Sequence, residues 1–325
     1  MKKEIGGYIE LIDYKDGYEY YEYANFNSAR NAFAFYALYY DVKKVYVPYY
    51  LCDSIINVCK KHKIDFEFYG IDRKLRPVFS KKILKNELLY IVNYFGTLTN
   101  EEILFLKNKY NQILVDNVQC FYTKPLENIP TIYSCRKFFG VPDGAYLSGF
   151  DNKNQFDLPQ NSAKNRMKHL LGRKNGTASQ FYRDFLKNEE FISKADFERM
   201  SFESQMILKK IDHKQIIECR NDNFDFLKTK LDSLNLLEVK KNNGPFCYPL
   251  LVKGGGEELR KYLIKNYIYI PIFWPNVVDE KRFAWETFLS KNLLPIPCDQ
   301  RYSLEDVRYI CDKIYEYESK KQKLN

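Results

Sequence analysis

Apolar, β-prone runs alternate with amphipathic helical stretches through the first 150 residues of this 325-residue chain. The run at residues 88–95 is almost continuously apolar, which is typical of a strand that is covered on both faces. Strands are also predicted at residues 45–47, 64–69, 113–115, 131–133 and 145–147, with helices at residues 27–40, 51–61 and 101–110. This alternation predicts a doubly wound α/β domain whose ligands bind at the carboxyl ends of the strands.

The pattern changes near residue 235. Residues 180–234 are predicted to be helical, and the later helices would link two domains. From residue 236 onward, strands and helices predict a small α+β domain. We therefore expect a large domain over residues 1–235, which opens with an irregular lead-in, and a small domain over residues 236–325. A chain of this length can bury one large core and one smaller core.

Two reactive residue types lie where the central predicted strands end. Asp116 follows the apolar run at residues 113–115, and Lys137 follows the run at residues 131–133. A carboxylate and a lysine in this order suit pyridoxal phosphate (PLP). The carboxylate keeps the pyridine nitrogen protonated, and the lysine amine forms a Schiff base with the aldehyde. The sequence therefore predicts a PLP site with Asp116 and Lys137 as its catalytic residues.

Further residues are predicted to contact the cofactor. Ser28 and Ala29 open a predicted helix whose free N–H groups would form a phosphate cradle, and an ordinary capped helix is the alternative. Ser134 could donate a hydrogen bond to the phosphate. Gln119 could bind the 3-hydroxyl or lie against the ring. Asn93, which follows another predicted strand, could touch the cofactor or substrate, or could be a turn residue.

These motifs resemble those of the DegT/StrS-type sugar aminotransferases, which are fold-type I PLP enzymes. D-x-x-Q at residues 116–119 precedes the lysine and a glycine-containing turn. Further likenesses are V-Y-V-P at residues 45–48, V-N-Y-F-G at residues 92–96 and R-M-S at residues 199–201. The resemblance covers roughly the first two thirds of the chain.

The resemblance implies a fold-type I fold and a PLP-dependent aminotransferase. An amino acid, with glutamate as the expected donor, would supply the amino group to a nucleotide-linked keto sugar through the Schiff base on Lys137. The freed lysine would then act as general base and acid. The resemblance also implies a homodimer with shared active sites and a setting in polysaccharide biosynthesis. Carboxyl-terminal residues cover the cofactor in this fold, so Trp274 or Arg301 could face the substrate.

The chain departs from the pattern of this family at three positions. Ser134 lies three residues before Lys137, whereas the family serine lies five before its lysine. Cys52, with Tyr50 close by, stands where the family has an aromatic residue that stacks on the ring. Phe197 replaces an asparagine that reaches across the dimer. In this chain the family pattern therefore identifies neither the residue that stacks on the ring nor the phosphate contact between subunits.

Three alternatives stay open. S-C-R-K at residues 134–137 resembles a turn of the cysteine desulfurases, although neither Cys247 nor Cys298 lies in a recognisable glycine-rich loop. A non-catalytic or regulatory relative would keep the fold and lose the reaction. A sugar-nucleotide-binding protein without PLP would leave Lys137 as a surface lysine.

The composition limits the kinds of partner that the protein is expected to bind. The formal charge is +9, but the lysines are spread along helices beside acidic residues, so no nucleic-acid-binding face is predicted. No run approaches the roughly 20 apolar residues of a membrane span, and no signal-peptide core follows the amino terminus, so we expect a cytoplasmic protein. The eight cysteines form no C-x-x-C pair and there are only three histidines, so reduced thiols and no metal site are predicted.

Overall fold

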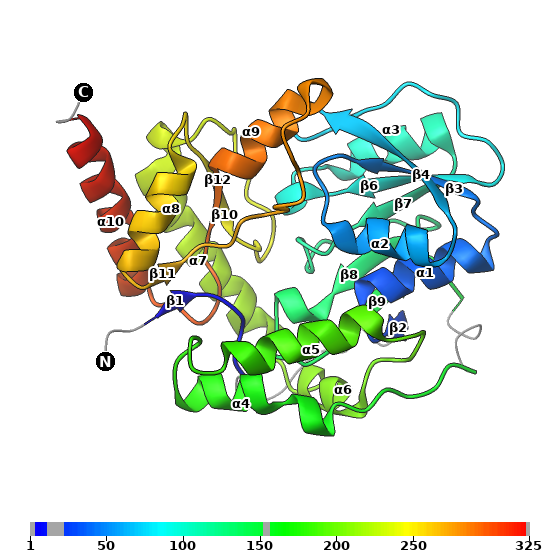
Figure 1. Cartoon of the computed structure of the whole chain (residues 1–325), viewed down its shortest axis with the longest axis horizontal. Helices are drawn as coiled ribbons and strands as arrows, with labels where there is room; N and C mark the ends of the chain where they lie inside the picture. Colours follow the sequence, from blue (N-terminus) through cyan, green and yellow to red (C-terminus); the bar gives the residue numbers. More distant parts are fainter. Residues whose placement is uncertain (1–3, 12–22, 152–156, 323–325) are drawn as a thin grey trace.

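A large, mostly parallel β-sheet forms the centre of the molecule (Figure 1). The structure is a computed structural model that describes residues 4–11, 23–151 and 157–322. The strands of this sheet are β2 (Ala24–Phe26), β3 (Lys44–Pro48), β4 (Asp65–Ile71), β5 (Pro77–Val78), β6 (Glu87–Val92), β7 (Ile113–Asp116), β8 (Thr131–Ser134) and β9 (Ala145–Ser148). Their order across the sheet is β2-β9-β8-β7-β6-β3-β4-β5. Because β4, β3, β6, β7 and β8 are parallel, their carboxyl ends meet at one edge.

Capped helices connect these strands. They are α1 (Ala29–Tyr39), α2 (Asp53–Lys61) and α3 (Asn100–Tyr110). The side chains of Ser28, Cys52 and Thr99 each accept a hydrogen bond from an N–H group in the first turn of the helix that follows. The predicted alternation of strands and helices up to residue 150 is confirmed, and so is the α/β fold class.

The carboxyl-terminal part forms a smaller unit beside the large sheet (Figure 1). Its elements are α7 (His213–Leu231), β10 (Tyr248–Leu251), α8 (Gly256–Lys265), β11 (Ile268–Tyr269), α9 (Ala284–Asn292), β12 (Leu293–Ile296) and α10 (Leu304–Gln322). β10 and β12 form a two-stranded antiparallel sheet. Pro295 lies within β12, and a sheet of only two strands tolerates it because each strand keeps one free edge.

The amino-terminal residues join this smaller unit. β1 (Ile5–Gly6) pairs in parallel with β11, so a segment that we expected to be irregular forms a short strand. The partner strand β11 is equally short, since only Ile268 and Tyr269 pair. The chain therefore returns its first described residues to the small domain, more than 200 positions away in the sequence.

Three further helices lie along the side of the molecule below the sheet in Figure 1. They are α4 (Lys168–Asn175), α5 (Tyr182–Lys194) and α6 (Phe202–Leu208). Among the described residues, no helix is long and apolar enough to cross a membrane. The same residues contain no group of three or more His, Cys, Asp or Glu side chains placed to hold a metal ion.

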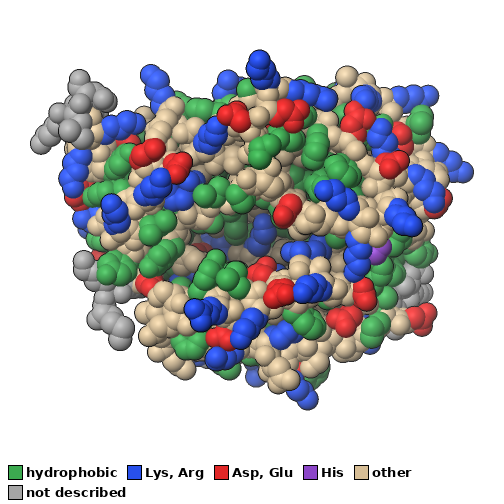
Figure 2. All heavy atoms as spheres, in the orientation of Figure 1, with side chains coloured by type: hydrophobic (Ala, Val, Ile, Leu, Met, Phe, Trp, Pro, Cys, Tyr) green, Lys and Arg blue, Asp and Glu red, His purple; other side chains and the backbone are tan. Residues whose placement is uncertain are grey.

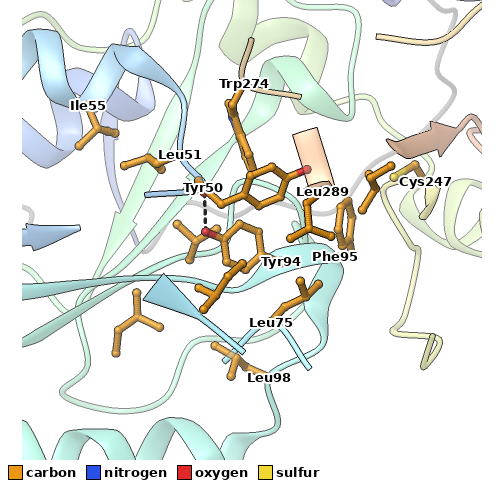
Figure 3. Packing of buried hydrophobic residues seen from close by; sticks show 14 of the residues in the cluster. Tyr50, Leu51, Ile55, Leu75, Tyr94, Phe95, Leu98, Cys247, Trp274 and Leu289 are labelled. Carbon is orange, nitrogen blue, oxygen red and sulfur yellow. Dashed lines mark hydrogen bonds between the residues drawn. The ribbon is translucent and has the colours of Figure 1, made fainter. Parts of the chain in front are cut away.

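One apolar core joins the two units (Figure 3). The Tyr50 and Trp274 rings meet edge to face, with their centres 4.4 Å apart, and Tyr94 lies 5.6 Å from Trp274. The Tyr94 hydroxyl donates a hydrogen bond to the Tyr50 carbonyl. These contacts place the loop after β11 against the loop after β3, at the carboxyl edge of the large sheet.

Candidate active site

A cavity of about 410 Å³ lies at the carboxyl edge of the large sheet, between that edge and the small unit. Figure 2 shows a hollow near the centre of this face, with lysine and arginine side chains inside it. The cavity is lined by strand ends of the sheet, the first residues of α1 and α2, the amino-terminal residues 6–9 and the loop after β11. The structure therefore places a pocket where parallel α/β sheets usually bind ligands.

Six of the nine predicted site residues line this cavity. They are Ser28, Ala29, Cys52, Asp116, Ser134 and Lys137. These residues come from the starts of α1 and α2 and from the ends of β7 and β8. Because the strands are parallel, residues that are about 20 positions apart in the sequence reach the same space.

Asp116 is a buried carboxylate at the end of β7. Its Oδ2 accepts a hydrogen bond from the Tyr90 hydroxyl at 2.6 Å, and its Oδ1 accepts one from the Val118 N–H at 2.9 Å. Burial raises the pKa of Asp116, while these hydrogen bonds and the positive charge of Lys137 oppose the rise. A cationic group in the cavity would therefore gain from contact with this carboxylate, and it would favour the ionised form.

Lys137 faces the cavity from the short turn that follows β8. Its Nζ lies 5.6 Å from the centre of the Phe246 ring. Within the part of the chain that the structure describes, no hydrogen bond or ion pair holds this amine. Lys137 is therefore available to a ligand in the cavity.

The structure does not bring Tyr50, Asn93 and Gln119 to the cavity wall. Asn93 shapes the loop after β6, as the turn alternative predicted. Its side-chain oxygen accepts a hydrogen bond from the Leu98 N–H at 2.9 Å, and its amide donates one to Asn117 at 3.1 Å. Asn93 is completely buried behind the wall, so these bonds engage it away from the cavity.

Tyr50 and Gln119 also support the wall from behind. Tyr50 is fully buried, and its ring packs against Trp274, which does line the cavity. Gln119 accepts a hydrogen bond from the Phe95 N–H at 3.1 Å. Phe95 has a φ of 54°, in the left-handed region, so this bond helps to hold a strained loop.

Cys52 lines the cavity at the position where the family resemblance implies an aromatic residue. Its sulfur lies 2.8 Å from the Ser54 hydroxyl and accepts a hydrogen bond from the Ser54 N–H at 3.4 Å. Val92, which pairs with Asp116 in the sheet, and Val118, in the loop after β7, are also on the wall. The wall near Asp116 also includes Tyr90, whose hydroxyl donates a hydrogen bond to that carboxylate.

The sequence analysis did not predict the wall formed by the amino-terminal strap, which we define as residues 5–11. The Arg173 guanidinium donates hydrogen bonds to the Gly6 carbonyl at 2.9 Å and to Glu10 at 2.8 Å. The Tyr8 ring stacks on Phe185 with a centre-to-centre distance of 4.9 Å. These contacts hold the strap in place as one part of the cavity wall.

One signal in the sequence could have indicated the strap. Gly6 has a φ of +89°, and a Cβ at this position would lie 2.1 Å from the Tyr269 carbonyl oxygen. A glycine is therefore required where β1 meets β11. In the sequence this requirement appears as two adjacent glycines, Gly6 and Gly7, near the amino terminus.

Arg301 and Trp274 both line the cavity, as the resemblance implied. The side chain of Arg301 is only 5% exposed, and it forms two hydrogen bonds with the Asp299 carboxylate, at 2.6 and 2.9 Å. It also donates a hydrogen bond to the Tyr8 carbonyl at 2.8 Å. Asp299 therefore already balances the charge of Arg301, and this arginine joins the strap to the small unit.

Comparison with known proteins identifies the fold. No protein-family model and no curated protein matches the chain. Solved structures do match, and they include Spr1654 from Streptococcus pneumoniae, which is assigned as a sugar aminotransferase. Its PLP form has a TM-score of 0.65 and 13% identity, and the match covers 91% of this chain and 87% of that one.

Two further matches have the same architecture. Helicobacter pylori PseC, an aminotransferase of pseudoaminic acid biosynthesis, has a TM-score of 0.58 and 16% identity, with 90% of this chain and 85% of that chain covered. The E. coli GDP-4-keto-6-deoxy-D-mannose-3-dehydratase with hydrated PLP has a TM-score of 0.62 and 14% identity, with coverage of 90% and 87%. The chain therefore has the fold-type I fold, and its structural neighbours include sugar aminotransferases of the DegT/DnrJ/EryC1/StrS type predicted from its motifs.

Proposed function

We propose that this chain is a PLP-dependent aminotransferase that transfers an amino group from an amino acid, with glutamate as the first candidate, to a nucleotide-linked keto sugar. One observation carries the proposal. Asp116 and Lys137, on neighbouring parallel strand ends, face a single cavity at the sheet edge. The fold in which they do so is shared with sugar aminotransferases in PLP-bound form.

The residues of the cavity fit PLP. Asp116 offers a buried carboxylate for a protonated pyridine nitrogen, and Lys137 offers an amine that has no hydrogen bond or ion pair to the described residues. Ser28, Ala29 and Ser134 offer hydroxyl and helix-end N–H groups for a phosphate. PLP, when bound, supplies an electron sink that makes the proton on the Cα of an amino acid labile.

Each of these protein groups would then have a separate role in the reaction. Lys137 would hold the cofactor covalently before the donor arrives, and its released amine would remove the Cα proton as a general base. Asp116 would keep the pyridine nitrogen protonated, because its negative charge stabilises a positive neighbour. The strap and Trp274 would exclude water from the reacting atoms by closing the cavity.

The partners are part of the proposal. We propose an amino-acid donor, a sugar-nucleotide acceptor and a homodimeric assembly, as the resemblance implies. The arginines of the cavity support an anionic acceptor, since clustered positive charge attracts phosphate groups. All eight cysteines are free, which supports the reducing, cytoplasmic setting expected from the sequence. We also propose a role in polysaccharide biosynthesis, as the resemblance implies.

An absorbance experiment tests the proposal. Purified wild type, Lys137→Ala and the exposed-lysine control Lys124→Ala are each mixed with PLP, and then with glutamate. We expect a visible band of protein-bound cofactor in wild type and in the control, absent in Lys137→Ala, and bleached by glutamate. Absence of the band from all three proteins would reject PLP. A band that no amino acid bleaches would favour the non-catalytic relative.

A cysteine desulfurase is the second candidate, because Cys247 lines the same cavity. Burial and the neighbouring Cys298 raise the pKa of this thiol well above its ordinary value, while Arg220 and Lys137 oppose the rise. A thiol held in its neutral form is a poor nucleophile, so we rank this activity second. If the wild type released sulfide from cysteine and Cys247→Ser did not, the cysteine desulfurase would become the first candidate.

A further inference from the structure

One buried cation takes no part in the proposed reaction. Arg220, on α7, is fully buried in the lining of the cavity, and it forms no ion pair within the described part of the chain. Burial raises the pKa of Asp299, but the positive charges of Arg301 and Arg220 outweigh this effect and lower the pKa below its ordinary value. Arg301 holds that carboxylate directly, so Arg220 shares its charge without a contact. Because a buried guanidinium is costly to desolvate, its hydrogen bonds must compensate for the cost.

The hydrogen bonds of Arg220 join three segments that are distant in the sequence. Its Nε donates to the side-chain oxygen of Gln300 at 2.7 Å, in the loop after β12. Its Nη1 donates to the carbonyls of Pro245 at 2.9 Å and Phe246 at 3.4 Å, just before β10. Its Nη2 donates to the Phe138 carbonyl at 3.4 Å, at the end of the short turn that follows β8. Arg220 therefore connects two loops of the small unit to this turn of the large sheet.

The same arginine fixes the residue next to Lys137. The guanidinium lies over the Phe138 ring, 4.6 Å from its centre, and also bonds the Phe138 carbonyl. Gln300 donates a second hydrogen bond to that carbonyl, at 2.9 Å. The Lys137 amine has no hydrogen bond or ion pair to the described residues, so the backbone of this turn and the packing around it set the direction of the side chain.

Arg220 also fixes the ring that the Lys137 amine faces. The Lys137 Nζ lies 5.6 Å from the centre of the Phe246 ring. That ring stacks on Phe273, which is another residue of the cavity wall, with a centre-to-centre distance of 6.0 Å. Because Arg220 bonds the carbonyls of both Phe138 and Phe246, it holds the lysine turn and this ring at a fixed separation.

We propose that Arg220 is a positioning residue for Lys137, which holds the Lys137 turn and the Phe246 ring together where the small unit meets the sheet. The role of the amine in transamination rests on the proposed function. The placement of the amine by Arg220 does not. An arginine suits this task because its planar guanidinium presents five N–H donors in a rigid fork, whereas a lysine would offer one mobile ammonium group.

Asn223 provides a matched control on the same helix. It is 1% exposed, and its side-chain amide donates hydrogen bonds to three carbonyls of the loop after β12, the shortest of them to Tyr302 at 2.9 Å. None of these acceptors belongs to the Lys137 turn or to the segment of Phe246. Asn223→Ala should therefore loosen the small unit without displacing the Lys137 amine.

The environment of the amine tests the proposal without any cofactor. Lysine amines are reductively methylated with isotope-labelled formaldehyde, and the NMR signal of Lys137 is identified by its absence in Lys137→Arg. In wild type the Phe246 ring should shift this signal away from those of exposed lysines, and Phe246→Leu should abolish the shift. We expect Arg220→Gln to lose most of the shift, Arg220→Lys to retain part of it and Asn223→Ala to retain all of it.

Three results of this measurement would overturn the proposal. They are an unshifted Lys137 signal in wild type, a full shift in Arg220→Gln, and equal losses in Arg220→Gln and Asn223→Ala. If Arg220→Gln does not fold, Arg220→Lys takes its place, because it keeps the buried charge. Its signal is then compared with that of Asn223→Ala after urea denaturation has measured the free energy of unfolding of both variants.

Covalent trapping of PLP separates this proposal from the proposed function. Each protein is incubated with PLP and borohydride, and mass spectrometry measures the rate at which Lys137 gains the label. Arg220→Gln should lower this rate by about 10²-fold, which is the cost of a displacement of about 1 Å, and Asn223→Ala should not. If Lys137 is not labelled even in wild type but its methyl signal depends on Arg220, the positioning stands and the aminotransferase does not. If wild type and Arg220→Gln are labelled equally fast, the positioning is wrong.

Discussion

The two sides of the cavity are built in opposite ways. The sheet side carries Asp116 and Lys137, each within three residues of the end of a strand. The opposite side is the amino-terminal strap, whose contacts span long distances in the sequence. The Tyr302 hydroxyl, for example, bonds the N–H of Gly6 across 296 positions. Local strand geometry thus places the reactive groups, and long-range packing covers them.

The two sides also differ in how their charges are paired. Among the described residues, Lys137 and Arg30 on the sheet side form no ion pair, although Arg136 on the same side pairs with Glu189. On the strap side, Arg301 is bound to Asp299 and lies 3.4 Å from Glu10. Polar groups left unpaired around a cavity indicate a ligand, whereas paired and buried charges stabilise the fold. The comparison therefore predicts that substitutions on the strap side mainly lower the free energy of unfolding. Substitutions on the sheet side should mainly lower ligand binding or the reaction rate.

Removal of Arg301 should have the largest effect on stability. Arg301→Met leaves the Asp299 carboxylate, which is 9% exposed, without its partner. Breaking a buried ion pair from one side costs about 3–5 kcal/mol in the free energy of unfolding. Urea denaturation without PLP measures this cost, with the exposed Arg308→Met as control. Equal stability of the two variants would show that the strap is not held by charge.

Acid should weaken the contact between the strap and α4. Burial, and secondarily Arg136, lower the pKa of His169 from 6.5 to about 4, while a hydrogen bond with the Arg166 backbone and the charge of Asp184 act in the opposite direction. Below pH 6.5 the unfolded chain binds a proton that the folded chain does not. The free energy of unfolding should therefore fall as the pH drops from about 6.5 to 4, by about 3 kcal/mol in total.

His169→Phe should flatten this part of the stability curve. The measurement is the difference in unfolding free energy between wild type and variant at each pH, which cancels the titration of other groups. Parallel curves for the two proteins would contradict the assignment to His169.

Asp116→Asn tests the sheet side directly. The amide keeps the shape of the side chain but removes the charge that would hold a protonated pyridine nitrogen. We expect PLP still to bind and the half-reaction with glutamate to slow by about 10²-fold, which corresponds to the loss of a hydrogen bond between charged groups. Asp65→Asn, at the exposed start of β4, is the control. Rapid mixing with glutamate measures the rate, and an unchanged rate would remove Asp116 from the chemistry.

The smallest predicted effect concerns the close approach of the strap to the sheet side. A Cβ on Gly140 would lie 1.9 Å from the Glu10 carbonyl oxygen, whereas a Cβ on Gly254 would have no atom within 4 Å. Gly140→Ala should therefore destabilise the fold by about 1–3 kcal/mol, as overpacking does, and Gly254→Ala should not. Thermal unfolding compares the two, and equal melting temperatures would show that the strap moves aside freely.

Much of the fold was predictable because its rules are local. Alternating apolar runs and capped helices correctly predicted β3, β4, β6, β7 and β8 with the helices between them. β12 was missed because Pro295 argues against a strand, and β1 because two residues carry no periodic pattern. Of the residues predicted at strand ends, Asp116 and Ser134 reached the cavity and Asn93 did not. Of those predicted from motif position, Cys52 reached the cavity, whereas Tyr50 and Gln119 lie behind its wall.

The sequence by itself determined the class of sheet, the edge at which a ligand would bind and the pair Asp116 and Lys137. Periodicity and strand direction decide these features within short segments. Only the tertiary structure decided that the amino-terminal strap forms part of the cavity wall, and that Arg301, which pairs with Asp299, also binds the Tyr8 carbonyl of the strap. The physical reason is that the contacts of the strap join segments about 160 to 300 residues apart, and no local pattern in the chain records which distant surfaces will pack together.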